Sequence, residues 1–218
     1  MDTPTIEKVL SILRKEVKQW DVPIITLIAR TKKDPFRVLI ATVLSLRTKD
    51  QVTAEAAQKL FAQADTAKTM LELTQKEIQE LIYPVGFYKV KSKNIIFICE
   101  KLQKEYHGKV PADMDKLLAF PNVGRKTANL VLSDGFGIPT MCVDVHVNRI
   151  SNRFGYIKTE NPFESEMALR AKLPKKYWIE YNFILVAFGQ HLCTPISPWC
   201  SKCPVSKYCE RKNITKSR

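Results

Sequence analysis

The sequence predicts an all-α fold, and three features support this prediction. Only seven of the 218 residues are glycine, strand-like alternation is scarce, and apolar residues recur at helical spacing between capping signals. Apolar residues make up 45% of the chain and charged residues 26%, as in ordinary globular proteins and unlike disordered ones. This length allows one large domain or two smaller ones, each with a real core.

In the N-terminal half, the expected helices start at proline or at capping residues. Pro4 suits a first helical position, and Asp34 with its following proline repeats this signal before the apolar stretch FRVLIATVLSL. Thr48 is expected to cap the next helix, and Thr74 opens a capping box. A long helix is then expected over about 88 to 107, with a glycine as its stop.

In the C-terminal half, short helices are again separated by capping residues and turns. The expected helices start near Asp113, Arg125, Asp144, Asn161 and Tyr177. No repeat, low-complexity run or Gly/Ser linker interrupts them. A division into domains must therefore arise from packing and not from a flexible tether.

The stretch PNVGRKTANLVL (121–132) reads as a tight turn leading into a helix. Such a turn needs unusual backbone angles, which Gly124 can supply and Asn122 tolerates. Backbone N–H groups of Asn122, Val123 and Gly124 then form a ready anion site, to which Arg125 adds charge. An ordinary helix–helix connection gives the same short pattern, so both interpretations stay open.

Lys126 stands in the first turn of this helix, where unpaired N–H groups disfavour another positive charge. One explanation is that an anion from outside the chain, such as a phosphate, binds there. The other explanation is that the lysine is needed as a neutral, nucleophilic amine. The residues around Lys126 do not decide between them.

Four of the six cysteines form a loop near the C-terminus. Their spacing is Cys193-x6-Cys200-x2-Cys203-x5-Cys209. Zinc sites usually contain two closely spaced pairs, whereas an iron–sulfur cluster accepts four thiolates at uneven spacing. The loop therefore favours a [4Fe–4S] cluster, with zinc as the alternative. Cys99 and Cys142 stand in apolar surroundings and are expected in the core.

The net charge of +13 comes from 35 Lys+Arg against 22 Asp+Glu. It suits a polyanion partner such as nucleic acid, although solubility alone gives the same excess. The apolar stretches are too short to span a bilayer, and the first residues lack the pattern of a secretion signal. We therefore expect no membrane partner and a location in the cytoplasm or nucleoid, or in the nucleus of a eukaryote.

Taken together, these motifs resemble the endonuclease III family of DNA base-excision glycosylases, in the helix-hairpin-helix superfamily. The matching segments, in the order of the family, are LSLRTKD (44–50), GFYKVKSKNI (86–95), PNVGRKTAN (121–129), VDVHVNR (143–149) and the cysteine loop. The resemblance covers nearly the whole chain, from about Ile24 to Cys209. It is specific because five motifs occur in the right order.

The resemblance implies two all-α domains in a monomer. One would be a six-helix barrel over 28–138 that contains the helix-hairpin-helix motif. The other would join 1–27 to 139–218 and carry the iron–sulfur loop at 193–209. Double-stranded DNA containing damaged bases or abasic sites would bind in the groove between them.

The resemblance also implies a bifunctional enzyme that removes oxidised pyrimidines and then nicks the abasic strand by β-elimination. Lys126 would form a Schiff base with the sugar, and Asp144 would be the catalytic carboxylate. The alternative roles are a phosphate contact for Lys126 and a helix N-cap for Asp144. For the whole chain, the alternatives are a monofunctional mismatch glycosylase, which has another residue in place of the lysine, and a non-catalytic DNA-binding module.

Arg47 and Phe87 stand where the family often has glutamine and leucine, in two loops that enter the opened duplex. Both side chains can fill space there, and the preferred opposite base stays open. His146 is placed near the site by the resemblance, whereas a histidine of the core or surface is the alternative. The full set of predicted DNA contacts is Arg47, Thr48, Lys49, Phe87, Lys91, Asn122, Val123, Gly124, Arg125 and His146.

Overall fold

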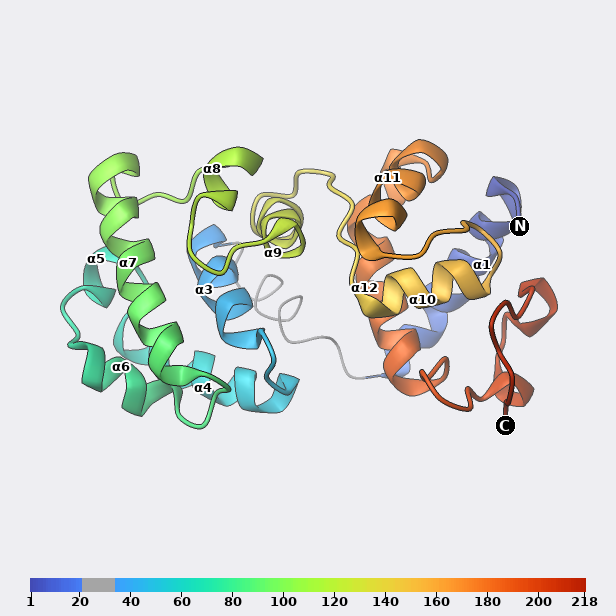
Figure 1. The fold of residues 1–218 in the computed structure, drawn as a ribbon, viewed down its shortest axis with the longest axis horizontal. Helices are drawn as coiled ribbons and strands as arrows, with labels where there is room; N and C mark the ends of the chain where they lie inside the picture. Colours follow the sequence, from blue (N-terminus) through green and yellow to red (C-terminus); the bar gives the residue numbers. More distant parts are fainter. Residues whose placement is uncertain (21–33) are drawn as a thin grey trace. The chain divides into compact units, whose positions relative to one another are not determined.

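The computed structural model describes residues 1–20 and 34–218, which fall into two compact units (Figure 1). The cysteine unit joins Met1–Pro23 to Pro139–Arg218, and the hairpin unit is Ile24–Ile138. The predicted domain boundary between residues 27 and 28 lies outside the described residues. The described ranges contain helices and no strand, so the predicted all-α class is confirmed.

The hairpin unit is built around helix α3. Its helices are α3 (Pro35–Ser45), α4 (Asp50–Gln63), α5 (Ala67–Met70), α6 (Gln75–Ile82), α7 (Tyr88–Tyr106), α8 (Met114–Leu118) and α9 (Arg125–Leu130). Helix α3 packs against α4, α7, α9 and the π-helical turn Val131–Gly135. Eight of its eleven residues are buried, which explains why its sequence is apolar on every side.

Capping residues set most helix starts as the sequence predicts. The Asp34 carboxylate accepts hydrogen bonds from the N–H groups of Phe36 at 3.0 Å and Arg37 at 3.4 Å. Thr74 and Glu77 form the expected capping box at the start of α6. The predicted cap at Thr48 is wrong, because α4 has Lys49 as its N-cap and no side-chain cap bond.

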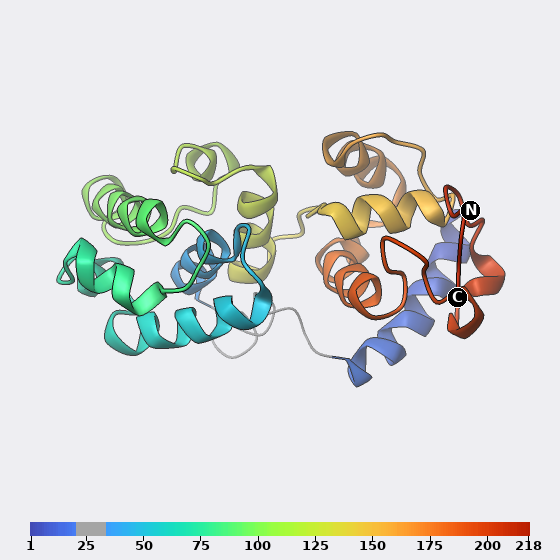
Figure 2. The same ribbon diagram turned by 60° about the horizontal axis from the view of Figure 1, so that its bottom comes forward.

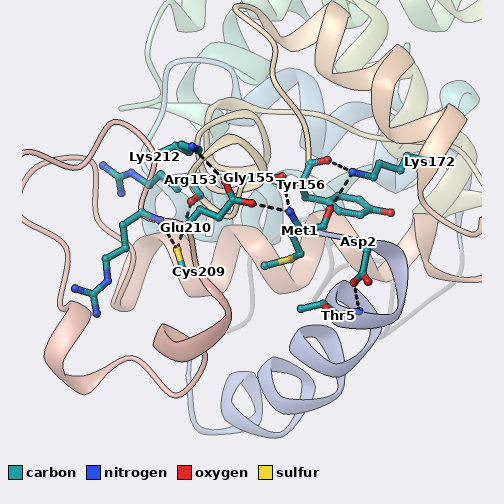
Figure 3. Close-up of polar contacts among 11 residues, drawn as sticks. Met1, Asp2, Thr5, Arg153, Gly155, Tyr156, Lys172, Cys209, Glu210 and Lys212 are labelled. Carbon is teal, nitrogen blue, oxygen red and sulfur yellow. Dashed lines mark hydrogen bonds and ion pairs between the residues drawn. The ribbon is translucent and has the colours of Figure 1, made fainter.

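The cysteine unit brings both ends of the chain together (Figures 1 and 2). Its helices are α1 (Thr3–Glu16), α10 (Val145–Arg153), α11 (Pro162–Lys172) and α12 (Trp178–His191). Helix α1 packs against α12, and both contribute to one apolar core with α10. Figure 3 shows how Lys172 fastens the first residue: its ammonium donates to the carbonyl oxygens of Met1 at 3.0 Å and Tyr156 at 2.6 Å.

Helix α12 is apolar because most of its surface is buried in this core. Across the described ranges, no helix combines the length and the apolar character that crossing a bilayer requires.

Candidate functional site

The turn 121–124 joins α8 to α9 and leaves an open space at its end. Asn122 has φ 61°, so its predicted tolerance of a left-handed conformation is used. The prediction for Gly124 is wrong, because its φ of −92° is accessible to any residue. A Cβ added to Gly124 would meet no described atom within 4 Å. The glycine therefore leaves room beside the helix start, and the turn does not need it for its backbone angles.

Val123 anchors this turn from the inside. Its side chain is buried in the core of the hairpin unit, and its N–H donates to the carbonyl of Phe120 at 3.2 Å. The predicted contact of Val123 with DNA therefore has to be corrected, because its only donor is already used within the turn. Asn122 and Gly124 are exposed, and Arg125 is half-buried.

Lys126 is the second residue of α9 and is exposed. The four residues that follow it, Thr127 to Leu130, are all buried and fix the helix against the core. The short helix therefore presents Lys126 on the surface, next to the open space at Gly124. Within the described part of the chain, the Lys126 side chain is open to solvent.

Asp144 belongs to the cysteine unit and is the N-cap of α10. Its Oδ1 accepts hydrogen bonds from the N–H groups of His146 at 2.8 Å and Val147 at 2.9 Å. The N-cap role is therefore present in the structure, and it fixes the orientation of the carboxylate. A catalytic role would use the same fixed orientation.

His146 is half-buried, and an arginine on its own helix sets its hydrogen bonding. Arg149 Nη2 lies 3.0 Å from His146 Nδ1, and Nδ1 must accept because arginine can only donate. The same guanidinium donates to the carbonyl of Cys193 at 2.9 Å. Gly189 makes room for this pair, because a Cβ there would lie 2.4 Å from His146 Nδ1. Helix α10 thus links Asp144 and His146 to the start of the cysteine loop.

Arg47 and Phe87 lie together although they come from loops forty residues apart in the sequence. The guanidinium carbon of Arg47 is 5.7 Å from the centroid of the Phe87 ring. Both residues are exposed and have left-handed backbones, with φ 53° at Arg47 and φ 58° at Phe87. Non-glycine residues rarely adopt this conformation, and such strain concentrates at functional sites. Lys49, close to Arg47 in the chain, is also exposed.

Lys91 is only 2% exposed, which contradicts its predicted contact with phosphate. Its ammonium donates to the carbonyls of Leu44 at 2.7 Å and Leu46 at 2.5 Å, and to the Thr48 hydroxyl at 3.1 Å. Burial lowers the pKa of Lys91 to about 8. The ammonium of Lys91 therefore donates its hydrogen bonds inside the protein. The hydroxyl of Thr48 also forms its hydrogen bonds inside the protein.

The four cysteines of the C-terminal loop line one cavity. Cys193, Cys200, Cys203 and Cys209 share it with apolar side chains such as Phe154, Phe188 and Trp199. None of the six cysteines, all of which lie in the described ranges, forms a disulfide bond. Burial raises the pKa of the Cys203 thiol to about 11, and it also raises the pKa values of Cys193 and Cys209. Cys99 and Cys142 are buried, as the sequence predicts.

Arg153 holds this loop from the end of α10, and the sequence analysis missed it. It is 6% exposed and donates to Cys193 Sγ at 3.3 Å, Thr194 O at 2.7 Å and Pro195 O at 2.6 Å. Its own carbonyl accepts from Cys209 Sγ at 3.4 Å (Figure 3). The spacing of Arg149 and Arg153 was a usable signal, since residues four apart share one helix face.

The donor set of the cavity is of a kind that an iron–sulfur cluster accepts. A cluster of several irons is larger than one ion and takes thiolates that are spread around it. Four thiols around one cavity, with an arginine donating to one sulfur, fit that requirement.

The two-unit helical fold carries a hairpin with an exposed lysine, an aspartate that caps a helix, and a four-cysteine loop. These features together are those of the helix-hairpin-helix class of DNA repair proteins. Residues 40–175 match the model of the HhH-GPD superfamily of base excision DNA repair proteins. The chain belongs to the endonuclease III family within this superfamily. The predicted family is therefore confirmed.

Similar proteins from other organisms support this membership. Endonuclease III of Thermotoga maritima is 44% identical over 177 residues, which cover 81% of this chain and 83% of the relative. Endonuclease III homolog 2, chloroplastic, of Arabidopsis thaliana is 38% identical over 219 residues, covering 93% of this chain but only 57% of the plant protein.

A solved structure extends the similarity to the fold. It is that of a trapped endonuclease III–DNA covalent intermediate, with a TM-score of 0.84, 32% identity and 97% coverage of both chains. The predicted function is confirmed with the family: the chain is a base-excision repair enzyme, a DNA glycosylase and abasic-site lyase acting on oxidised pyrimidines.

Proposed function

We propose that Lys126 is the nucleophile of this reaction and that Asp144 is its catalytic carboxylate. The observation that carries the proposal is the position of Lys126. It is exposed in the first turn of α9, beside the open space at Gly124. From this position its amine can reach a sugar that enters the open space, as a nucleophile must.

In the proposed reaction, the Lys126 amine forms a bond to the sugar C1′ while the bond from C1′ to the base breaks. The base leaves with the bonding electrons and takes up a proton. Asp144, held by its two N-cap hydrogen bonds, stabilises positive charge on the sugar or accepts the proton that the amine loses. The ring bond from C1′ to O4′ then breaks as the nitrogen lone pair forms the C=N bond of the Schiff base, and O4′ takes up a proton. The Schiff base makes the C2′ proton acidic, and loss of this proton expels the 3′ phosphate and nicks the strand.

The proposed partner is double-stranded DNA that contains a damaged base or an abasic site. The base must leave the stack before the amine can reach C1′, and side chains that fill the gap offset the cost of unstacking. Arg47 and Phe87, which lie together, are the proposed wedge, and Asn122, Gly124 and Arg125 are proposed phosphate contacts beside Lys126. Bound DNA would exclude solvent from the exposed lysine. Lys49 and His146 remain proposed contacts.

We propose a [4Fe–4S] cluster as the cofactor of the cysteine loop. Cys193, Cys200, Cys203 and Cys209 would be its ligands. The support is the cavity that they share and the donation of Arg153 to Cys193 Sγ, which favours the thiolate. When bound, the cluster would fix the loop, and no step of the reaction requires it.

The test of this function uses three duplexes and one variant. The parent protein should cleave duplexes that contain thymine glycol or an abasic site, and it should leave uracil opposite guanine uncut. Lys126→Gln should lose strand cleavage of the thymine glycol duplex by about three orders of magnitude, because the covalent route itself is removed. It should still bind an abasic duplex.

Each alternative predicts a different result. A monofunctional glycosylase would release a mismatched base without cutting the strand. A docking module would bind all three duplexes and cut none. Cleavage by Lys126→Gln at the rate of the parent protein would contradict the assignment of the nucleophile.

A further inference from the structure

A hydrogen-bond network around the buried Lys91 joins the loop of Arg47 to the loop of Phe87. We call it the brace and define it as Lys91, Thr48 and the N–H of Gly86, with the carbonyls of Leu44 and Leu46. It lies entirely within the hairpin unit. The two loops are separated by α4, α5 and α6 in the sequence, so no local interaction holds them together.

The Lys91 ammonium is fully used by this network. It has three N–H donors and makes three hydrogen bonds, to Leu44 O, Leu46 O and Thr48 Oγ1. The two carbonyls belong to the end of α3 and its C-cap, where helix carbonyls lack partners within the helix. Lys91 itself lies in the first turn of α7, which begins directly after Phe87. One side chain therefore ties the end of α3 to the start of α7.

Thr48 takes part in three hydrogen bonds of the same network. Its hydroxyl donates to Leu46 O at 3.3 Å and accepts from Gly86 N at 3.2 Å and Lys91 Nζ at 3.1 Å. One donated and two accepted bonds exhaust the capacity of a hydroxyl group. The hydroxyl is therefore committed to positioning the loops.

Gly86 brings the two backbones into direct proximity. A Cβ at this position would lie 2.7 Å from the carbonyl oxygen of Arg47, closer than real Cβ atoms approach. A larger residue would force the loops apart. Arg47, whose carbonyl makes this close approach, and Phe87, which follows Gly86, both have left-handed backbones.

We propose that the brace fixes the positions of the two loops relative to each other, so that Arg47 and Phe87 enter the DNA as one preformed wedge. Thr48 and Lys91 are then positioning residues for extrusion of the damaged base. The inference rests on the proposed function, because it assigns the wedge role to Arg47 and Phe87. Its distinctive consequence is that loss of the brace should impair steps that open a duplex and spare steps that do not.

The test compares two matched pairs of variants. Thr48→Val removes the hydroxyl but keeps the shape, whereas Thr48→Ser keeps the hydroxyl. Lys91→Met removes the buried ammonium, whereas Lys104→Met removes an exposed charge from the same helix, outside the brace. Thermal unfolding and iron content show which variants remain folded.

Two activities and one spectroscopic signal are measured for each variant. Thr48→Val and Lys91→Met should lower the single-turnover rate on a thymine glycol duplex by about 10- to 100-fold, as misplaced groups typically do. Lyase activity on an abasic site in single-stranded DNA should change by less than about 2-fold, since no duplex has to be opened. Thr48→Ser and Lys104→Met should behave as the parent protein in both assays.

The signal is the fluorescence of 2-aminopurine placed opposite the lesion, which rises when the stack is opened. At saturating protein, Thr48→Val and Lys91→Met should give a smaller rise than their matched controls. This readout needs no chemistry and can be repeated in the Lys126→Gln background, so it decides the inference even if the assignment of the nucleophile fails.

Equal loss of the duplex and single-strand activities would overturn the inference, because it would show a general structural role. An undiminished fluorescence rise in a folded Thr48→Val protein would also overturn it. If Lys91→Met does not fold, Thr48→Val against Thr48→Ser decides the matter alone, since valine has two methyl groups where serine has one hydroxyl and one hydrogen.

Discussion

At the scale of single residues, the Asp144 carboxylate combines a helix cap with its proposed catalytic role. Both hydrogen bonds of the cap go to Oδ1, so the orientation of the carboxylate is set by the start of α10. Helix capping and charge can be separated by substitution, because asparagine caps helices about as well as aspartate. A variant at this position therefore tests the charge with little change in the fold.

Asp144→Asn should lower base release by about 100- to 10,000-fold, the usual range for a lost acid–base group. It should keep measurable borohydride trapping on a pre-formed abasic site, where the aldehyde is already present and only the amine is needed. The two rates are measured in separate single-turnover assays. Equal loss in both would mean that Asp144 acts in Schiff-base formation itself, and no loss in either would leave it as a cap only.

The residues that could be predicted are those whose partners are near in the sequence. Asp34 and Asn161 cap helices through N–H groups two or three residues away, and a local pattern identifies such caps. Lys91 could not be predicted, because its partners lie more than forty residues before it. In the run YKVKSK it reads as one more exposed lysine. The side chain of Arg153 likewise reaches about forty residues ahead to the cysteine loop.

At the scale of elements, the turn 121–124 with α9 can be either a plain connection or an anion site. The backbone of Gly124 is accessible to alanine, and the space beside it is open, so neither strain nor a clash requires glycine there. A functional reason is that a ligand comes close to the backbone at this point. The two interpretations therefore predict different effects on DNA affinity when a methyl group is added at Gly124.

Gly124→Ala should fold normally and bind duplex DNA less tightly. Its stability should fall by less than about 1 kcal/mol, the difference between glycine and alanine as N-cap residues. Affinity for an abasic duplex, measured by anisotropy at one fixed salt concentration, should fall by about 10-fold, which corresponds to about 1.4 kcal/mol. Unchanged affinity would favour the plain helix–helix connection.

Helix starts were predictable where a capping residue precedes an apolar pattern, as at Thr74 and Asp113. Helix α5 was not predicted, because four residues are too few to show a helical period. The π-helical turn Val131–Gly135 after α9 could not be predicted, since the sequence pattern of one turn does not distinguish a π-helix from an α-helix. The arrangement of the four thiols around one cavity could not be predicted from the sequence and is shown by the structure.

At the scale of the whole molecule, we expect the excess of 13 positive charges to attract the phosphate backbone of DNA. Part of the excess is internal: Lys91 is buried, while Lys89 and Lys93 on either side of it are exposed. Only exposed cations can displace counterions from the phosphate backbone. The predicted monomeric state stays a prediction.

Binding to undamaged duplex should weaken steeply as salt rises. Each neutralised phosphate contributes about −0.9 to the slope of log affinity against log salt. Lys89→Gln and Lys93→Gln should each make this slope shallower by about one unit if both contact phosphates, whereas Lys91→Met should leave it unchanged. If the affinity of the parent protein did not change with salt concentration, its positively charged side chains would not contact the DNA phosphates.

The central claim is that Lys126 bonds to the sugar, and borohydride reduction tests it most directly. The protein is incubated with an oligonucleotide duplex that contains one abasic site, reduced, digested with nuclease and protease, and analysed by mass spectrometry. The account predicts a single sugar adduct, on the peptide that contains Lys126, and no adduct from Lys126→Gln. An adduct on another lysine or on the α-amino group, with Lys126 unmodified, would contradict it.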